Sequence, residues 1–396
     1  MRAPFLLLSV CLLPRRSAAV VLTGLLVGVA TLPTPLRAEV GVGPRSILLG
    51  QSAAFSGPSG ELGREFRQGA HQVFDEVNAQ GGIHGRQVVM VYRDDRYEPA
   101  LAQRNTERFI RDDKVFALFG YVGTPTVQAS LPLINRYQVP LIAPLTGAQL
   151  IRKPQIPLVF NIRASYHQEI EAIVHYLVRF GRRSIAVVYQ NDAYGRDCFA
   201  GVQKAMASRR LRPVAVATVQ RNSNQTNEAA RRIALARPDA VIIVSSYGTV
   251  ASLISNLRRL GSQALVMNLS FVGSNALART LPVSDRHGVG ISQVVPFPWN
   301  PRVPVVRDYQ NTISRNRSDA RYGFSSLEGY IAATMMVRAL EAAGPALTRK
   351  RFINTLESMA SVDLGGFRLS FSPNKHQGSD FVQLTFIVGR DGAFIH

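Results

Sequence analysis

Apolar, strand-like runs alternate with amphipathic, helix-like stretches over most of this chain, and the alternation limits the possible folds more than any other feature. Arg45–Phe55 has the composition of a buried strand, and the stretch after it repeats apolar residues at helical spacing until Gly81-Gly82. Further strands are predicted at 86–95, 114–120, 139–144, 184–189, 212–219, 239–246 and 263–268. Strands that alternate with helices form parallel sheets with helices on both faces. We therefore predict an α/β fold of doubly wound parallel sheets.

The number of predicted strands indicates two similar lobes. About nine strands precede residue 295, more than one twisted sheet holds comfortably, and 396 residues are enough for two cores. The proline-rich segment Pro296–Pro304 breaks the alternation and reads as a connector. After it, Ser326–Ala343 is predicted to be a helix with one apolar face, and the end of the chain reads as strand, turn and strand.

The segment 1–38 has the pattern of an export signal. Arg15 and Arg16 precede the apolar stretch Ala18–Ala30, and Ala38 is the small residue after which a signal peptidase would cut. The apolar stretch is short for a membrane span, and no later segment approaches about 20 apolar residues. We predict a cleaved signal peptide, with a retained anchor as the alternative.

The charge of the chain bears on its partners. The formal net charge is +20, but the basic residues are scattered, nearly all are arginine, and no basic stripe with interleaved aromatic residues occurs. We therefore expect an arginine-rich, solvated surface and no nucleic-acid partner. Cys198 is the only cysteine after the signal segment, so we expect no intrachain disulfide there.

Small, polar loops follow the predicted strands in both halves of the chain. In open parallel sheets, ligands bind beyond the carboxyl ends of the strands, where these loops gather. Glycines let the backbone approach a ligand, and hydroxyl groups and helix N-termini can receive a carboxylate. Each loop taken alone is equally well explained as a turn or a helix cap. Their recurrence in both halves favours a binding cleft, and the loops are 56–63, 120–126, 144–149, 191–197, 245–249 and 269–276.

Motifs for catalysis or metal binding are missing from the sequence. It contains no GxGxxG, GxxxxGK[ST], HExxH or GxSxG pattern and no paired CxxC. The dispersed histidines, such as His71, His84, His167 and His175, are expected at the surface or in caps. We predict that the protein is not an enzyme and holds no cofactor and no metal.

Two stretches resemble a known family. "SGPSGELGREFRQGAHQVFDEVNAQGGIHGRQVVMVYRDDRYEPALA" and "NDAYGRD" are similar to type I periplasmic solute-binding proteins of the branched-chain amino-acid, or leucine-binding, class. The resemblance covers residues 45–396. Members of this class have two α/β lobes joined by three crossovers, and they bury a ligand when the lobes close like a Venus flytrap. The resemblance implies a first lobe of 39–162 with 296–361 and a second lobe of 163–295 with 362–396.

The resemblance also implies a ligand-binding set. In amino-acid-binding members, two neighbouring loops of the first lobe grip the α-carboxylate of the ligand, and those positions are Gly123, Thr124, Thr146 and Gly147 here. We expect a solvent-filled gap between Thr146 and Tyr194. The remaining implied contacts are Ser56 and Leu62 at the mouth, Tyr194 closing over the ligand, Tyr247, and Ser270 beside Phe271.

The chain departs from the family pattern at several of these places. An acidic residue of the second lobe normally neutralises the ammonium group of the ligand, and Ser270 stands at that position. Burying an unpaired ammonium costs several kcal/mol, which a serine does not offset. Gly147 replaces one of the carboxylate-binding hydroxyl residues, and Tyr97 and Val122 occupy the places of a common disulfide. We therefore expect a carboxylic acid, an amide or an aromatic ligand without an α-ammonium group.

The function implied is solute capture for transport. We expect a periplasmic, monomeric substrate-binding subunit of an ABC-type importer, which captures a small polar solute by lobe closure. Its partners would be this small-molecule ligand and an inner-membrane permease with its ATPase. The alternative is a periplasmic sensor that presents its bound form to a membrane signalling receptor. An enzyme on the same fold is the third reading, and it lacks a convincing base in the loops.

Overall fold

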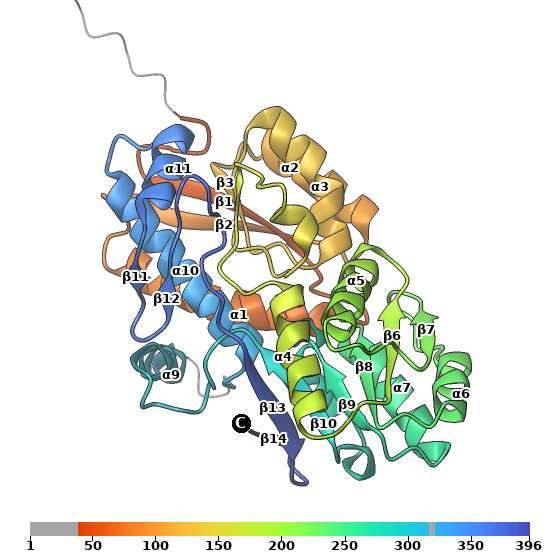
Figure 1. Ribbon diagram of the computed structural model, residues 1–396. Helices are drawn as coiled ribbons and strands as arrows, with labels where there is room; N and C mark the ends of the chain where they lie inside the picture. Colours follow the sequence, from red (N-terminus) through yellow and green to blue (C-terminus); the bar gives the residue numbers. More distant parts are fainter. Residues whose placement is uncertain (1–38, 317–320) are drawn as a thin grey trace, which may run out of the picture. The chain divides into compact units, whose positions relative to one another are not determined.

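A computed structural model describes residues 39–316 and 321–396 (Figure 1). The described residues form one compact unit. The predicted signal peptide lies outside the described residues. Within the described part of the chain, no helix combines the length and the apolar character that crossing a membrane requires.

The first sheet contains five parallel strands in the order β2-β1-β3-β4-β5. Its long pair, β1 and β2, aligns Ser46 with Gln87 and Ala53 with Asp94. The strands are β1 (Ser46–Ala53), β2 (Gln87–Asp94), β3 (Ala117–Phe119), β4 (Leu141–Ile142) and β5 (Val159–Phe160).

The second sheet contains seven strands in the order β14-β13-β10-β9-β8-β6-β7. Strands β6 to β10 pair in parallel, whereas β13 runs antiparallel to both β10 and β14, so that the end of the chain extends this sheet (Figure 1). The strands are β6 (Ile185–Gln190), β7 (Val216–Val219), β8 (Ala240–Val244), β9 (Leu265–Asn268), β10 (Val289–Gln293), β13 (Gln383–Val388) and β14 (Ala393–Ile395). A separate antiparallel pair joins β11 (Val362–Asp363) to β12 (Arg368–Leu369).

Helices begin at residues with clear start signals. Pro99 and Pro125 stand in the first turns of their helices, Ser165 forms a capping box with Gln168, and Asp192 accepts bonds from two backbone amides. The α-helices are α1 (Gly60–Ala79), α2 (Pro99–Arg111), α3 (Thr124–Tyr137), α4 (Tyr166–Arg179), α5 (Ala193–Ala207), α6 (Asn227–Leu235), α7 (Tyr247–Arg259), α8 (Ser274–Thr280), α9 (Pro304–Asn316), α10 (Phe324–Ala343) and α11 (Arg349–Ser358). Three short 3₁₀ turns are η1 (Gln149–Ile151), η2 (Ser270–Val272) and η3 (Val283–Asp285).

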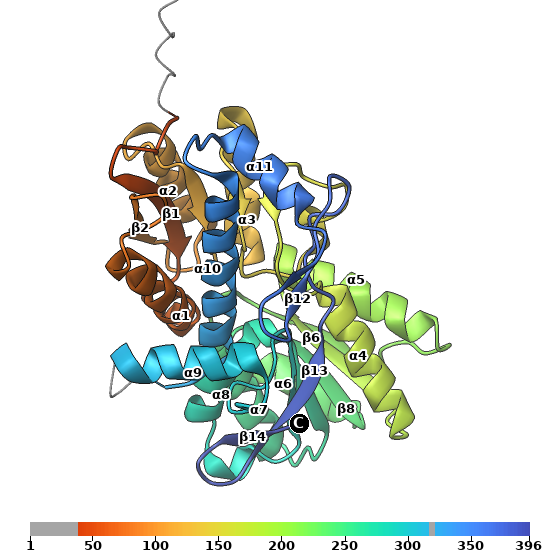
Figure 2. The same cartoon turned by 90° about the vertical axis from the view of Figure 1, so that its left-hand side faces the viewer.

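Helix α10 lies against α1 in an unusually close contact (Figures 1 and 2). A Cβ atom on Gly69 would come within 1.7 Å of the Ser326 carbonyl oxygen, and one on Gly329 within 2.0 Å of the Phe66 carbonyl oxygen. The two backbones therefore touch where only glycine fits. The sequence predicted one apolar face for α10, whereas the structure buries most of its circumference, because α10 is covered on several sides.

The predicted α/β fold with parallel sheets is confirmed, with additions. The short strand β5 and the strand β10 were not predicted, and neither was the antiparallel pairing of β13. The assignment of 39–162 with 296–361 and of 163–295 with 362–396 to two lobes stays a prediction.

Candidate ligand-binding site

Loops from the two sheets meet at the carboxyl ends of their strands. Ser59, after β1, donates from its hydroxyl to Ser246 Oγ at 3.1 Å, after β8. Tyr97, after β2, accepts a hydrogen bond of 3.2 Å from Gln190 Nε2 at the end of β6. The predicted convergence of polar loops therefore exists, and it joins the two sheets in one contact region.

The predicted residues Gly123, Thr124, Thr146 and Gly147 lie together, and we call them the hydroxyl corner. The Thr124 and Thr146 hydroxyl groups are hydrogen bonded at 2.7 Å, and both residues are buried. Gly123 has φ 98° and precedes the first turn of α3, whose N–H groups have no partner within the helix. The hydroxyl corner therefore offers neutral donors at a helix N-terminus, which suits a carboxylate.

Arg152 supports the hydroxyl corner from behind. Its Nη2 donates to the Thr146 carbonyl oxygen at 3.1 Å and its Nε to the Gly147 carbonyl oxygen at 3.3 Å. Burial, with a contribution from nearby Arg163, lowers the pKa of Arg152 to about 9, so the guanidinium stays charged at neutral pH. A positive charge therefore stands close behind the neutral donors.

Four aromatic rings fill the contact region, and we call them the aromatic cluster: Tyr97, Tyr166, Tyr194 and Phe271. The ring centroids of Tyr194 and Phe271 are 4.8 Å apart, those of Tyr166 and Tyr194 5.0 Å, and those of Tyr97 and Phe271 5.6 Å. All four side chains are fully buried. The phenolic oxygens of Tyr166 and Tyr194 have no hydrogen-bond partner, which leaves two polar atoms inside an apolar contact.

The expectation of a solvent-filled gap between Thr146 and Tyr194 is wrong for this structure. Thr146 and Tyr194 are both fully buried, and Tyr166 lies beside Tyr194. The same ring packs on Gly147, where an added Cβ would come within 2.7 Å of Tyr166 Cδ1. Several side chains expected to hold a ligand thus contact one another instead.

The remaining predicted residues are divided between this region and its edge. Leu62 is buried and reaches the turn at Gly273, which Tyr247 also contacts. Ser56 is exposed, and its hydroxyl is bonded to Asp94 on its own side of the molecule. Ser59, which we did not predict, reaches the second sheet in its place.

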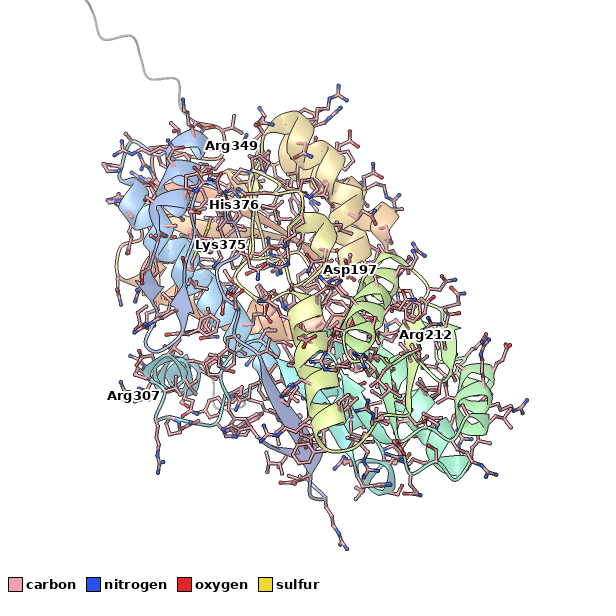
Figure 3. All side chains as sticks on the ribbon, viewed as in Figure 1. Asp197, Arg212, Arg307, Arg349, Lys375 and His376 are labelled. Atoms are coloured by element: carbon pink, nitrogen blue, oxygen red, sulfur yellow. The ribbon has the colours of Figure 1, made fainter. Side chains whose placement is uncertain are left out.

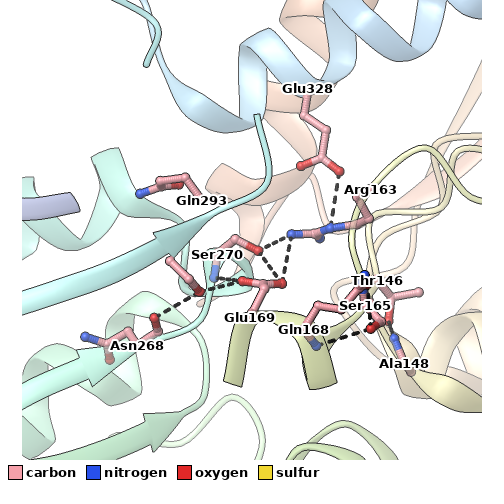
Figure 4. A network of polar contacts seen from close by, with 12 residues as sticks. Thr146, Ala148, Arg163, Ser165, Gln168, Glu169, Asn268, Ser270, Gln293 and Glu328 are labelled. Carbon is pink, nitrogen blue, oxygen red and sulfur yellow. Dashed lines mark hydrogen bonds and ion pairs between the residues drawn. The ribbon is translucent and has the colours of Figure 1, made fainter. Parts of the chain in front are cut away.

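A buried carboxylate lies against Ser270, where the sequence indicated none. Glu169 Oε2 accepts a bond from the Ser270 backbone N–H at 2.9 Å and Oε1 one from the Ser270 hydroxyl at 3.0 Å (Figure 4). The Ser292 hydroxyl donates to Glu169 Oε2 at 2.6 Å. Helix α4 thus supplies an acidic group at this place, so Ser270 does not leave an α-ammonium group of a ligand without a nearby carboxyl group.

Glu169 belongs to an acid cluster with Arg163 and Glu328. Arg163 Nη2 is 3.8 Å from Glu169 Oε1, and Arg163 Nε is 3.4 Å from Glu328 Oε1 (Figure 4). All three side chains are at most 5% exposed. Arg163 follows β5 of the first sheet, Glu169 lies on α4 and Glu328 on α10, so the acid cluster connects three elements.

Burial and the neighbouring charges cause the pKa shifts in the acid cluster. Burial raises the pKa of Glu169 and of Glu328, although Arg163 opposes both shifts. Burial alone would lower the pKa of Arg163, but Glu328 and Glu169 outweigh it and raise that pKa. Arg152 also lowers the pKa of Glu328, so two guanidinium groups, Arg163 and Arg152, stand near the two carboxyl groups.

Comparison with known proteins places the chain in a family. The family described as "Periplasmic binding protein" matches residues 46–391. The chain belongs to this family. Among solved structures, a possible leucine/isoleucine/valine-binding protein from Rhodopirellula baltica is 31% identical with a TM-score of 0.85, covering 91% of this chain and 98% of that one. A substrate-binding periplasmic protein from Ralstonia solanacearum is 30% identical with a TM-score of 0.83, covering 88% and 99%.

Curated relatives of this periplasmic binding protein are more distant. A leucine-, isoleucine-, valine-, threonine- and alanine-binding protein of Pseudomonas aeruginosa is 20% identical over 76% of this chain and 79% of its own length. The chain spans only 63% of an amino acid binding protein of the same organism, at 20% identity. The predicted family and the type I periplasmic binding protein fold are confirmed, and these relatives are named as binding proteins.

Several residues of this region were not predicted from the sequence. Arg163, Tyr166 and Glu169 lie three residues apart immediately after β5, which the sequence reading did not identify as a strand. If β5 had been predicted as a strand, the loop after it would have been a further candidate for ligand binding. Glu328 gave no such signal, because it lies inside a long apolar helix.

Possible metal ligands are dispersed in residues 39–316 and 321–396. No three His, Cys, Asp or Glu side chains in this part of the chain gather as a metal site. Cys198 is free and buried, and burial raises its pKa well above the ordinary value, so it stays a thiol.

Proposed function

We propose that this periplasmic binding protein is the substrate-binding subunit of an ABC-type importer and captures a small, amino-acid-like solute. The two predicted lobes close over the solute and deliver it to a permease and its ATPase in the inner membrane. The observation that carries the proposal is the meeting of groups from both sheets in one buried region, where Tyr97 and Phe271 rings are 5.6 Å apart. A ligand that contacts both sides stabilises closure through differential affinity.

The charges on the two sides favour a zwitterion. The hydroxyl corner, with Arg152 behind it, suits a carboxylate, and the buried carboxyl group of Glu169 beside Ser270 suits an ammonium group. This assignment replaces the sequence-based expectation of a ligand without an α-ammonium group. Among structures that share only the fold, one from Thermus thermophilus holds valine and one from Rhodopseudomonas palustris holds benzoate, so the fold accommodates both ligand types.

A matched ligand series tests the ligand class. The purified protein is titrated with leucine, 4-methylpentanoate and leucinamide, and with an equivalent aromatic series, and thermal shifts are measured because a tight ligand stabilises by mass action. We expect the zwitterion to bind most tightly in each series. Tighter binding of the carboxylate that lacks an amino group would instead support the expectation, based on Ser270, of a ligand without an α-ammonium group.

The role of Glu169 is tested by Glu169→Gln. We expect leucine affinity to fall at least about tenfold, with little change for 4-methylpentanoate, because only the ammonium group loses a charged partner. Glu171→Gln is the control on the same helix, since its side chain is 53% exposed and paired with Arg209. Equal losses for both ligands would place Glu169 in a structural role.

Transport is tested in cells. Deleting the gene should abolish high-affinity uptake of the ligand found above, and restoring the unaltered gene should recover it. Undiminished uptake with a lost transcriptional response would instead indicate the sensor. Mass spectrometry of the periplasmic protein should show an N-terminus at Glu39 if the signal peptide is cleaved as predicted.

A further inference from the structure

A cavity of about 240 Å³ is lined by Arg152 but by none of the predicted ligand-binding residues, and we call it the basic cavity. Its wall comes from the segment after β4 and from the segment between β12 and β13. The backbone of Asn161 forms two hydrogen bonds, of 2.8 and 2.7 Å, with the second of these segments. The lining includes Arg152, Lys153, Asn161, Lys375 and His376, and none of the described residues that line it carries a carboxylate.

Two nearly buried side chains that line the basic cavity have polar atoms without a partner. Arg152 is 8% exposed, and Nη1 is the nitrogen of its guanidinium that donates to no acceptor. Asn161 is 1% exposed, and its Oδ1 atom is also unpartnered. Buried polar atoms in folded proteins nearly always have partners, so unpartnered ones beside a cavity point to a ligand or ordered water.

The basic cavity has a cationic lining. Two of the five lysines in the sequence, Lys153 and Lys375, line it together with Arg152. Two acids are close by: Asp380 is 4.0 Å from Lys375 Nζ, and Glu357 pairs with His376 Nε2 at 3.2 Å. Arg152 also interacts electrostatically with Glu169, Asp197 and Glu328, none of which lines the cavity. Figure 3 shows where Lys375, His376 and Asp197 lie in the structure.

We propose that the basic cavity is a second binding site, for a small oxyanion of the polycarboxylate or phosphate class. Guanidinium and ammonium groups converge there, and such groups form charge-assisted hydrogen bonds with carboxylate and phosphate oxygens. The volume exceeds that of a single water or a monatomic ion and suits a short di- or tricarboxylate. This site is separate from the cleft and does not depend on the proposed transport function.

Citrate, succinate and inorganic phosphate are the probes, titrated calorimetrically into the full chain at matched ionic strength, with erythritol as a neutral control. The test variant is Lys153→Gln/Lys375→Gln, which changes two side chains at the cavity rim and keeps Arg152. Lys350→Gln is the matched control, because Lys350 is exposed and lies outside the cavity.

We expect at least one anion to bind the unaltered protein and Lys350→Gln equally, and to lose about tenfold or more in affinity for the double variant. Equal affinity for all three proteins would mean non-specific attraction to a basic surface and would overturn the site. Absence of binding by every probe would overturn it as well. These titrations are made without a cleft ligand, so failure of the transport proposal does not affect their outcome.

The basic cavity and the hydroxyl corner share Arg152. An anion next to Arg152 reduces the positive potential behind Thr146 and Gly147, so we expect it to weaken binding of a carboxylate in the cleft by about two- to fivefold. Titration of the cleft ligand with and without citrate measures this coupling. An unchanged affinity would refute the coupling, while the titrations above decide the site.

Discussion

The hydroxyl corner and the acid cluster face the same contact region but are built in opposite ways. The hydroxyl corner is neutral, comes from the loops after β3 and β4, and bonds its two threonines to each other at 2.7 Å. The acid cluster is charged, comes from distant parts of the chain, and leaves Glu328 Oε1 and two Arg163 nitrogens without hydrogen bonds. The neutral corner is therefore satisfied within the protein, whereas the charged cluster keeps polar atoms without hydrogen-bond partners.

The largest expected effect tests the charged side. Arg163→Met leaves two buried carboxyl groups without their cation, and we expect a loss of about 3–5 kcal/mol in the free energy of unfolding. Urea denaturation measures it. Arg307→Met is the control, because that side chain is 55% exposed. A loss no larger than that of the control would show that the carboxyl groups are neutral in the fold.

The next effect tests how tightly the hydroxyl corner is packed. Gly123→Ala places a Cβ atom 2.2 Å from Tyr97 Cε2 at a residue with φ 98°. We expect the free energy of unfolding to fall by about 2 kcal/mol, as measured by urea denaturation. Gly57→Ala is the comparison, because Gly57 also has a positive φ but open space around it. Equal losses of unfolding free energy for the two variants would mean that only backbone strain matters and that the Tyr97 ring moves aside without a penalty.

A smaller effect separates satisfied from unsatisfied hydroxyl groups. Thr146→Val removes a hydroxyl that bonds Thr124, and we expect a loss of about 1 kcal/mol in the free energy of unfolding. Tyr194→Phe removes a buried hydroxyl without a partner, and we expect no loss or a small gain. Chemical denaturation of both variants measures the difference, and a comparable loss for Tyr194→Phe would reveal a bridging water.

A pH-dependent effect concerns a contact between helices α1 and α8. Glu65 on α1 is 3.3 Å from Arg279 on α8, and burial, opposed by Arg279, raises the pKa of Glu65 from 4.5 to about 7. Because the folded-state pKa exceeds the unfolded one, the contribution of Glu65 to stability falls as the pH rises from about 4.5 to about 7.

Glu65→Gln should therefore be more stable than the unaltered protein by a few degrees in Tm at about pH 8 and by less at about pH 5. Thermal unfolding at both values measures the shift. A Tm difference that does not change with pH would assign an ordinary pKa to Glu65.

The fold and the hydroxyl corner were largely within reach of the sequence. Apolar runs and glycine-ended helices mark the strands that carry the loops, and Gly123 and Thr146 follow such strands directly. The pattern is local, because each strand and its loop are contiguous in the chain. The ligand role of these residues stays a prediction, and only their positions are described by the structure.

The sequence alone thus determined the α/β alternation, the parallel sheets and the neutral loops at their carboxyl ends, because hydrophobic periodicity is a property of neighbouring residues. Only the tertiary structure decided that Glu169 lies against Ser270, that Glu328 meets Arg163 and that Tyr166 packs on Gly147. Such contacts depend on how separate elements pack. Burial then strengthens the interaction of each charged group with its neighbours and shifts its pKa, because the protein interior has a low dielectric constant.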